Sequence, residues 1–369
     1  MASIYAGSTV TIAATMSVSD LEGFTALSPP EHISRKFTYL SETGIPHTFH
    51  ARKTLAHGHT PKPYPLLTRG WVLQERLLSP RVVHFTRDEI IWECMERTTC
   101  ECGCIRFLWS PGWVPFNKNL LHEPNLSMMS RAELNATWHQ IVQEYSRLNL
   151  TFSRDRLPAI SGAARILSQF QGSAYYAGLW RASFVRDMMW KRHGSSQKSK
   201  KLDKTPSWSW ASINAEVTYN EDAITTTEMV AVMDIIMEPI ATNDQFGTVR
   251  GGLAVLSGFL VSSHQVRAML RLDDQEGDLY RALQGLGALS LDVDEYSVAE
   301  SNIYFFKLSV QTLVSSKARN QEVSIILLSS GSGACVYRRV GLLERTFEGP
   351  QPEIDIYKDV DETTTVSIV

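Results

Sequence analysis

The sequence predicts a mixed α+β protein of three successive regions, and three patterns carry that prediction. Over residues 1–105, short apolar and β-branched runs flank one clear helical segment, which is typical of an α/β domain. Residues 106–205 change to an apolar spacing near 3.6, which indicates helices. Residues 206–369 hold short apolar runs between polar breaks, which predict a β-rich region, with a loose tail at 359–365.

Length and composition are those of a folded protein with more than one domain. The chain has 369 residues, 43% hydrophobic and 20% charged, which fits two or three domains of ~150 residues each. Its formal net charge of −3 supplies no overall positive field, so general nucleic-acid binding is not expected. No stretch reaches ~18 uninterrupted apolar residues, so no membrane span is expected either.

Cysteine usage indicates a reducing compartment. The cysteines number five, and the N-terminus lacks a basic segment followed by an apolar one, so we expect a cytoplasmic protein. Cys94, Cys100, Cys102 and Cys104 form a cluster. Single-residue spacers make it hard for four cysteines to surround one zinc ion. We therefore expect reduced thiols and no metal, with a metal site as the alternative.

The first region offers the clearest local signals. We expect a buried strand at 10–14, a long Pro- and His-rich surface segment over 28–65 with one strand in it, and a helix at 68–79. That helix starts at a threonine able to cap it and stops before a proline. A hairpin of strands 81–85 and 89–94 follows.

Packing expectations follow from the apolar residues of these elements. One buried cluster is predicted to contain Trp71, Val72, Leu77, Val83, Phe85, Ile90 and Trp92. If so, Trp71→Ala costs roughly 3–5 kcal/mol. The other tryptophans are predicted to pack between the helical and β-rich parts, the alternative being a ligand platform. They form three sequence pairs: Trp109 with Trp113, Trp180 with Trp190, and Trp208 with Trp210.

Two further features concern binding and chemistry. The basic stretch 191–204 is interpreted as a solvated loop rather than a phosphate site. Glu75 is the candidate catalytic carboxylate, because Trp71 lies one helical turn before it on the same face. A carboxylate beside an aromatic wall can stabilise an oxocarbenium-like centre or orient a ribose hydroxyl. The alternative for Glu75 is a structural salt bridge or cap. The sequence singles out no cofactor-binding residue.

Two parts of the first region resemble the fungal heterokaryon incompatibility (HET) domain. The resembling residues are 4–14, 68–81, Phe85 and 92–94, and the Arg-Gly-Trp-x-Leu-Gln-Glu run at 69–75 is the most specific part. Segments 176–180, 206–212 and 337–342 resemble sequences that often follow the domain. The family's domain usually begins further upstream, so residues 1–105 are expected to be its C-terminal part, from a truncated product, a mis-predicted start or a degenerate copy.

The resemblance implies non-self recognition and regulated fungal cell death through protein partners or self-association. The HET domain is similar to the TIR fold, a flavodoxin-like α/β sandwich, and some TIR domains cleave NAD with a glutamate on a helix. Glu75 would match that glutamate, with Trp71 beside it. Three hypotheses follow, of which the first is favoured: a binding protein without chemistry, an NAD glycohydrolase that uses Glu75 with NAD as substrate and no cofactor, and an inactive remnant.

Overall fold

The chain forms two compact units. The computed structural model describes residues 2–19, 21–23, 30–53, 55, 64–87, 89–103, 118–194, 199–202, 204–220, 222–241, 244–272, 278–293, 302–314, 319–330 and 335–369. The N-terminal unit comprises Met1–Ser130 and Leu148–Leu150, and the C-terminal unit comprises Arg131–Arg147 and Thr151–Val369. The sequence suggests three regions instead, because it assigns the helical segment 106–205 to a region of its own. Most of that segment shares a core with the β-rich part.

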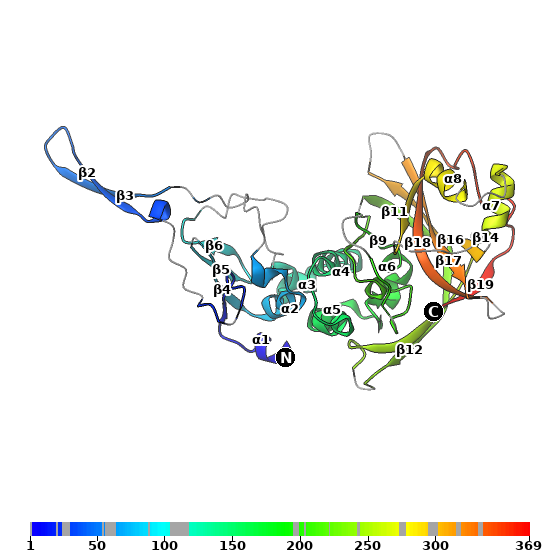
Figure 1. Ribbon diagram of the computed structural model, residues 1–369, viewed down its shortest axis with the longest axis horizontal. Helices are drawn as coiled ribbons and strands as arrows, with labels where there is room; N and C mark the ends of the chain where they lie inside the picture. The colour runs from blue at the N-terminus through cyan, green and yellow to red at the C-terminus, as the bar shows by residue number, and fades with distance from the viewer. Residues whose placement is uncertain are drawn as a thin grey trace. The chain divides into compact units, whose positions relative to one another are not determined.

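The N-terminal unit contains a four-stranded sheet in the order β1-β4-β5-β6 (Figure 1). Its strands are β1 (Thr11–Ala13), β4 (Arg81–Phe85), β5 (Ile90–Cys94) and β6 (Thr98–Cys100). β1 and β4 are parallel, whereas β4, β5 and β6 are antiparallel neighbours. A parallel pair needs a crossover connection, and this one contains helix α2 (Gly70–Leu78). The predicted helix and hairpin are therefore confirmed. The predicted threonine cap is wrong, because Arg69 precedes the helix without a side-chain cap and the Thr68 hydroxyl donates instead to the Pro65 carbonyl at 2.8 Å.

The segment between β1 and α2 holds a two-stranded hairpin. β2 (Arg35–Leu40) pairs antiparallel with β3 (Pro46–Ala51), and every residue of both strands is exposed. The rings of Phe37 and Phe49 stack across the pair with centroids 5.4 Å apart. The predicted surface segment is confirmed, but it holds two strands where one was expected. The second strand contains Pro and His in place of most of the β-branched residues that usually indicate a strand. Two short helices complete the unit, α1 (Ala2–Ala6) and α3 (Glu123–Met128).

The buried face of the hairpin differs from the predicted one. Val82 and Ile91 are buried together with the polar residues His84 and Glu93. By contrast, Val83, Phe85 and Trp92 are only half-buried and Ile90 is exposed, so their predicted cluster is wrong in the strands. Successive side chains of a strand point to opposite faces, and choosing the wrong face therefore misplaces every residue.

Strand β1 also differs from expectation. It lies at the edge of the sheet in the described part of the unit, and the Ile12 side chain is 62% exposed. The prediction of a strand at 10–14 is confirmed for residues 11–13, but of these only Ala13 is buried, because β1 has a described neighbour on one side only.

The C-terminal unit begins with helices packed around tryptophan side chains. The longer ones are α4 (Arg131–Ser146) and α5 (Ser161–Gln171), followed by the short α6 (Phe184–Asp187). Two small sheets join them, β7 (Tyr175–Tyr176) with β8 (Leu179–Trp180) and β9 (Lys191–Arg192) with β10 (Val217–Thr218). The fully buried tryptophans are Trp138, Trp180, Trp190, Trp208 and Trp210. The predicted tryptophan core is confirmed for these residues, whereas Trp109 and Trp113 lie outside the described residues.

A large sheet forms the rest of the C-terminal unit, in the order β11-β16-β17-β18-β19-β13-β12 (Figure 1). These strands are β11 (Ala223–Glu228), β12 (Val230–Pro239), β13 (Val249–Gly258), β16 (Ile303–Leu313), β17 (Arg319–Ser329), β18 (Val336–Glu348) and β19 (Thr364–Ile368). β14 (Leu260–Ser262) pairs with β16, and β15 (Ala288–Leu291) pairs with β18.

Two helices and the last strand complete this sheet's packing. α7 (Ser263–Leu270) and α8 (Asp278–Leu286) contribute Val266 and Leu283 to a buried apolar cluster with Phe305 of β16. β19 pairs with β13 and β18, and its Val366 is fully buried. The loose tail predicted at 359–365 is thus wrong at its end, because backbone pairing orders a segment whose composition is polar.

None of the helices described has both the length and the apolar character needed to cross a bilayer. The molecule as a whole is mixed α+β, as the sequence predicts.

Candidate functional site

Helix α2 places the two residues singled out for catalysis on one side. Trp71 and Glu75 are both half-buried, which agrees with their spacing of one turn. Burial first, and the nearby Glu75 negative charge second, raise the pKa of the Tyr5 phenol on α1. Glu75 therefore has a tyrosine partner from the other resembling segment, which links α1 to α2.

Arg76, the next residue of α2, is buried and forms an ion pair with strand β5. Its Nε and Nη2 donate to the Glu93 carboxylate at 2.7 and 2.6 Å, in a two-pronged pair. Nε2 of His84, on β4, lies 3.1 Å from Oε2 of the same Glu93 carboxylate. Nδ1 of His84 lies 3.0 Å from the Thr15 hydroxyl. The exposed fractions are 7% for Arg76, 1% for Glu93 and 3% for His84.

Electrostatics keep this buried cluster charged. Burial alone would raise the pKa of Glu93, but Arg76 first and His84 second lower it to about 2. The ammonium group of Lys118, also buried, donates a hydrogen bond to the Ser79 carbonyl just after α2. Burial lowers the pKa of Lys118 to about 8, with Glu93 opposing that shift. Such a cluster holds the helix against the sheet, because a buried charge is tolerated only with its partner present.

Sequence reasoning missed this cluster for a physical reason. Arg76, His84 and Glu93 sit inside predicted elements, but their polar character suggested the solvent side. Bidentate arginine–carboxylate geometry is what makes the buried position tolerable. The two-residue alternation along each strand could have located it. Val82 pairs with Glu93 and His84 pairs with Ile91, so all four side chains lie on one face of the hairpin.

The cysteine cluster is partly described. Sγ of Cys100 lies 3.3 Å from Sγ of Cys102, a separation longer than the ~2.05 Å of a disulfide bond. Glu89 accepts from the Cys102 backbone N–H at 2.8 Å, and one ligand atom from each of these three residues falls within 4.8 Å of the others. The Arg52 guanidinium also lies 3.7 Å from the Glu89 carboxylate. It would repel a metal ion bound to that carboxylate, because both carry positive charge. Cys104 lies outside the described residues.

Two cavities in the described part of the C-terminal unit bring together residues that the sequence did not single out. The smaller, about 200 Å³, is lined by His139 and Tyr219 among others. His139 places Nε2 2.8 Å from Oδ1 of Asp187, whose other oxygen accepts the Trp180 backbone N–H at 2.7 Å. The His139 ring stacks on Tyr219 with centroids 3.8 Å apart. The residues come from distant points of the chain, so local pattern gave no sign of this arrangement.

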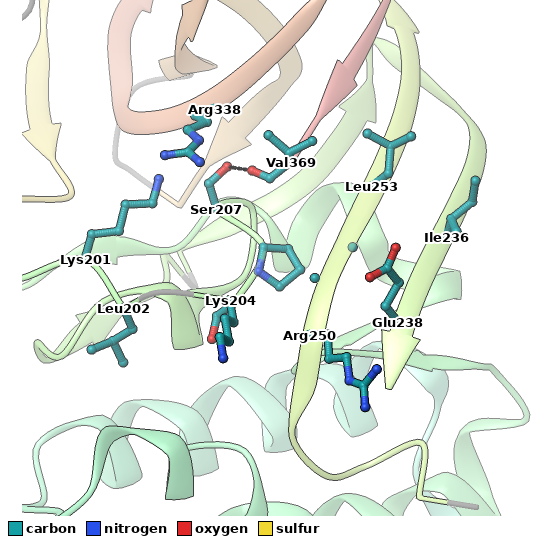
Figure 2. Close-up of a pocket in the computed structure, with 14 residues that line it drawn as sticks. Lys201, Leu202, Lys204, Ser207, Ile236, Glu238, Arg250, Leu253, Arg338 and Val369 are labelled. Atoms are coloured by element: carbon teal, nitrogen blue, oxygen red, sulfur yellow. Dashed lines mark hydrogen bonds between the residues drawn. The ribbon is translucent and has the colours of Figure 1, made fainter. Parts of the chain in front are cut away.

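The larger cavity, about 360 Å³, lies between the segment around Ser207 and strands β12, β13 and β18 (Figure 2). Its lining includes Lys201 and Lys204 of the basic stretch. The prediction of a solvated loop for that stretch is wrong in part, because Lys191–Arg192 form β9 and Lys201 is only partly exposed. Neither cavity is lined by Trp71 or Glu75. Chemistry at Glu75 therefore rests on the resemblance and on the partial exposure of its side chain.

Comparison with known proteins adds no relative. No family model, curated protein or solved structure matches the chain.

Proposed function

We propose that this chain is a HET-type protein of the fungal cytoplasm that takes part in non-self recognition and regulated cell death by binding, either to a protein partner or to a second copy of itself. One observation carries the proposal: the two resembling segments, far apart in sequence, fold into one body. β1 pairs in parallel with β4 from Thr11–Val82 to Ala13–His84. Tyr5 and Glu75 join the same two segments at their helices.

Residue roles within the resembling run support binding over chemistry. Leu73, Leu77 and Leu78 are buried in the core, and Arg76 is engaged with Glu93. The β–α–β arrangement of β1, α2 and β4 supports the TIR-like, flavodoxin-like part of the proposal, since parallel neighbours with a helical crossover are the unit from which such folds are built.

The surface of this unit offers a place for a partner. β1 is an edge strand among the described residues, and the exposed fractions of Ile4 and Ile12 are 70% and 62%. An edge strand presents unpaired backbone groups to which another chain can add. Exposed aliphatic side chains beside it add contact area that gains from burial.

Expression in a filamentous fungus tests this proposal through cell viability. We expect the chain to lower viability, Ile12→Lys to weaken that effect, and Glu75→Gln to retain it. Val314→Lys is the matched control, because Val314 is an aliphatic residue of the other unit that is 68% exposed. Full toxicity of Ile12→Lys would contradict binding at this edge, and no toxicity from the folded wild-type chain would favour the inactive remnant.

The NAD glycohydrolase hypothesis has its own readout. Glu75 is partly exposed next to the Tyr5 phenol, an arrangement that leaves a carboxylate near solvent and an aromatic ring. Purified chain is incubated with NAD and released nicotinamide is measured. We expect release no faster than in buffer. Release that Glu75→Gln abolishes, without loss of folding by circular dichroism, would replace the binding proposal by the enzymatic one.

A further inference from the structure

Four cationic side chains line the 360 Å³ cavity of the C-terminal unit. They are Lys201, Lys204, Arg250 and Arg338, and the one acidic side chain of the lining is Glu238. They come from the segment before Ser207, from β13 and from β18, so the fold rather than one basic run brings them together. Figure 2 shows Lys201 and Arg338 extended toward one another beside Ser207.

Among the residues that the structure describes, none of these four cations forms an ion pair with a carboxylate within 4.0 Å, although the negative charge of Asp292 acts on Lys201 from further away. Elsewhere the same unit pairs its cations closely: Lys191 lies 2.6 Å from Glu344, and Lys307 lies 2.8 Å from Glu322. Like charges around one concavity repel one another and raise the local concentration of anions. The cavity therefore carries an excess of positive charge that an anionic ligand could neutralise.

The pKa of the Lys201 ammonium group reflects the nearby positive charges. Burial first, and the positive charge of Arg338 second, lower this pKa to about 8. An anion placed between Lys201 and Arg338 would favour the charged form of the lysine, since an opposite charge within a few ångströms stabilises it.

The remaining walls are fixed and partly apolar. The backbone N–H of Ser207 donates to the Val369 carbonyl at 3.0 Å, which joins β19 to the segment that carries the lysines. Gly252 lets that segment approach β13, because a Cβ there would lie 2.9 Å from Cγ of Pro206 and 2.6 Å from Sδ of Met237. Ile236 and Leu253 supply apolar lining.

We propose that this cavity binds a small organic phosphate with at least two negative charges, its phosphate between Lys201 and Arg338 and its less polar part toward Ile236 and Leu253. The volume falls within the range of ~300–1,000 Å³ usual for small-molecule sites. The guanidinium of Arg338 suits a phosphate because its donors form a planar fork that can engage two oxygens. This site is independent of the proposed recognition function, because all its residues belong to the other unit.

Isothermal titration calorimetry on the full chain tests the proposal with five probes: adenosine diphosphate, glucose 6-phosphate, pyrophosphate, sulfate and adenosine. We expect at least one of the organic phosphates to bind at least tenfold more tightly than pyrophosphate, and adenosine not to bind. Arg338→Gln and Lys201→Met are each expected to weaken binding at least tenfold. Lys358→Met is the matched control, since Lys358 is exposed and does not line the cavity.

The pH dependence separates a direct contact from a structural role. Since the pKa of Lys201 is about 8 in the free protein, affinity is expected to fall several-fold between pH 7 and pH 9.5. Lys201→Arg, which stays charged, is expected to bind and to lose that pH dependence. The proposal is overturned if none of the phosphates binds, if sulfate binds as tightly as they do, or if binding survives both Lys201→Met and Arg338→Gln.

Discussion

The two units differ in the side chains that they bury between helix and sheet. In the N-terminal unit, the face of the hairpin that packs against α2 carries Glu93 and His84, held by Arg76. In the C-terminal unit, the helices bury five tryptophans and the large sheet buries aliphatic and phenylalanine side chains. Both units bury ion pairs, Arg76 with Glu93 in the first and Arg339 with Asp292 in the second, but the C-terminal unit surrounds its pairs with a much larger apolar core. They are expected to respond differently to substitution and to pH.

The largest expected effect is in the C-terminal unit. Trp138 is fully buried, packs edge-on against Trp180 at 5.9 Å, and donates its indole N–H to the Gly178 carbonyl at 2.8 Å. Trp138→Ala is expected to lower the free energy of unfolding by roughly 4–5 kcal/mol, as other large aromatic deletions do. Urea-dependent hydrogen exchange, read by peptide, assigns the loss to the C-terminal unit. Phe152→Ala, at a 54% exposed position of that unit, is the control. A loss below ~1 kcal/mol for Trp138→Ala would contradict the claim that the buried tryptophans stabilise the C-terminal unit.

A single charge change is expected to act almost as strongly in the N-terminal unit. Arg76→Ala leaves the Glu93 carboxylate buried without its arginine, which costs roughly 3–4 kcal/mol. Exchange protection is expected to fall in the peptides of α2, β4 and β5 while the C-terminal unit keeps its own. The control is Arg87→Ala, because Arg87 is exposed on the hairpin turn. Equal effects of the two substitutions would contradict the role given to Arg76.

Acid is expected to separate the units. The pKa of Glu93 is lowered to about 2 in the folded chain, so its contribution of roughly 3 kcal/mol is complete above pH ~4.5 and is lost as the pH falls toward 2. Burial raises the pKa of Asp292 in the C-terminal unit, with Arg339 opposing, and a raised carboxyl pKa favours the folded state at lower pH. Hydrogen exchange at pH 5, 4 and 3 is expected to show the N-terminal unit losing protection first. Simultaneous loss in both units would contradict this order.

The smallest effect concerns Trp71. The predicted cost of roughly 3–5 kcal/mol rests on substantial burial, and this side chain is partly exposed. We now expect Trp71→Ala to cost about 2–3 kcal/mol, because part of the ring already contacts solvent. The same urea-dependent exchange measures it, with Leu77→Ala as the fully buried comparison in the same helix. A Trp71 cost equal to that of Leu77 would mean that the ring is more buried in solution.

Local signals in the sequence predicted the elements better than their faces. The helix at 70–78 and the following hairpin could be predicted because apolar spacing, a proline and a short turn act over a few residues. Their buried face could not, because it depends on Arg76 meeting Glu93 across the fold. β19 shows the same limit, since the burial of its alternating Val366 and Ile368 depends on pairing with β13, which is distant in sequence.

The candidate site residues divide in the same way. Glu75 and Trp71 were found through a local motif, and the structure places both on one side of α2. The cavity formed by Lys201, Arg250 and Arg338 joins residues that are far apart in the chain. No spacing rule could have assembled them, because the large sheet brings β13 and β18 to one wall through strand pairings of long range.

A double-mutant cycle on Arg76 and Glu93 tests most directly the claim that a buried ion network holds the N-terminal unit together. Arg76→Met, Glu93→Leu and the double variant are unfolded in urea, and the free energy of unfolding of that unit is measured for each by hydrogen exchange. The account predicts that each single change is severe and that the double variant recovers at least ~2 kcal/mol relative to their sum. Additivity within ~0.5 kcal/mol would show that the two side chains do not stabilise each other.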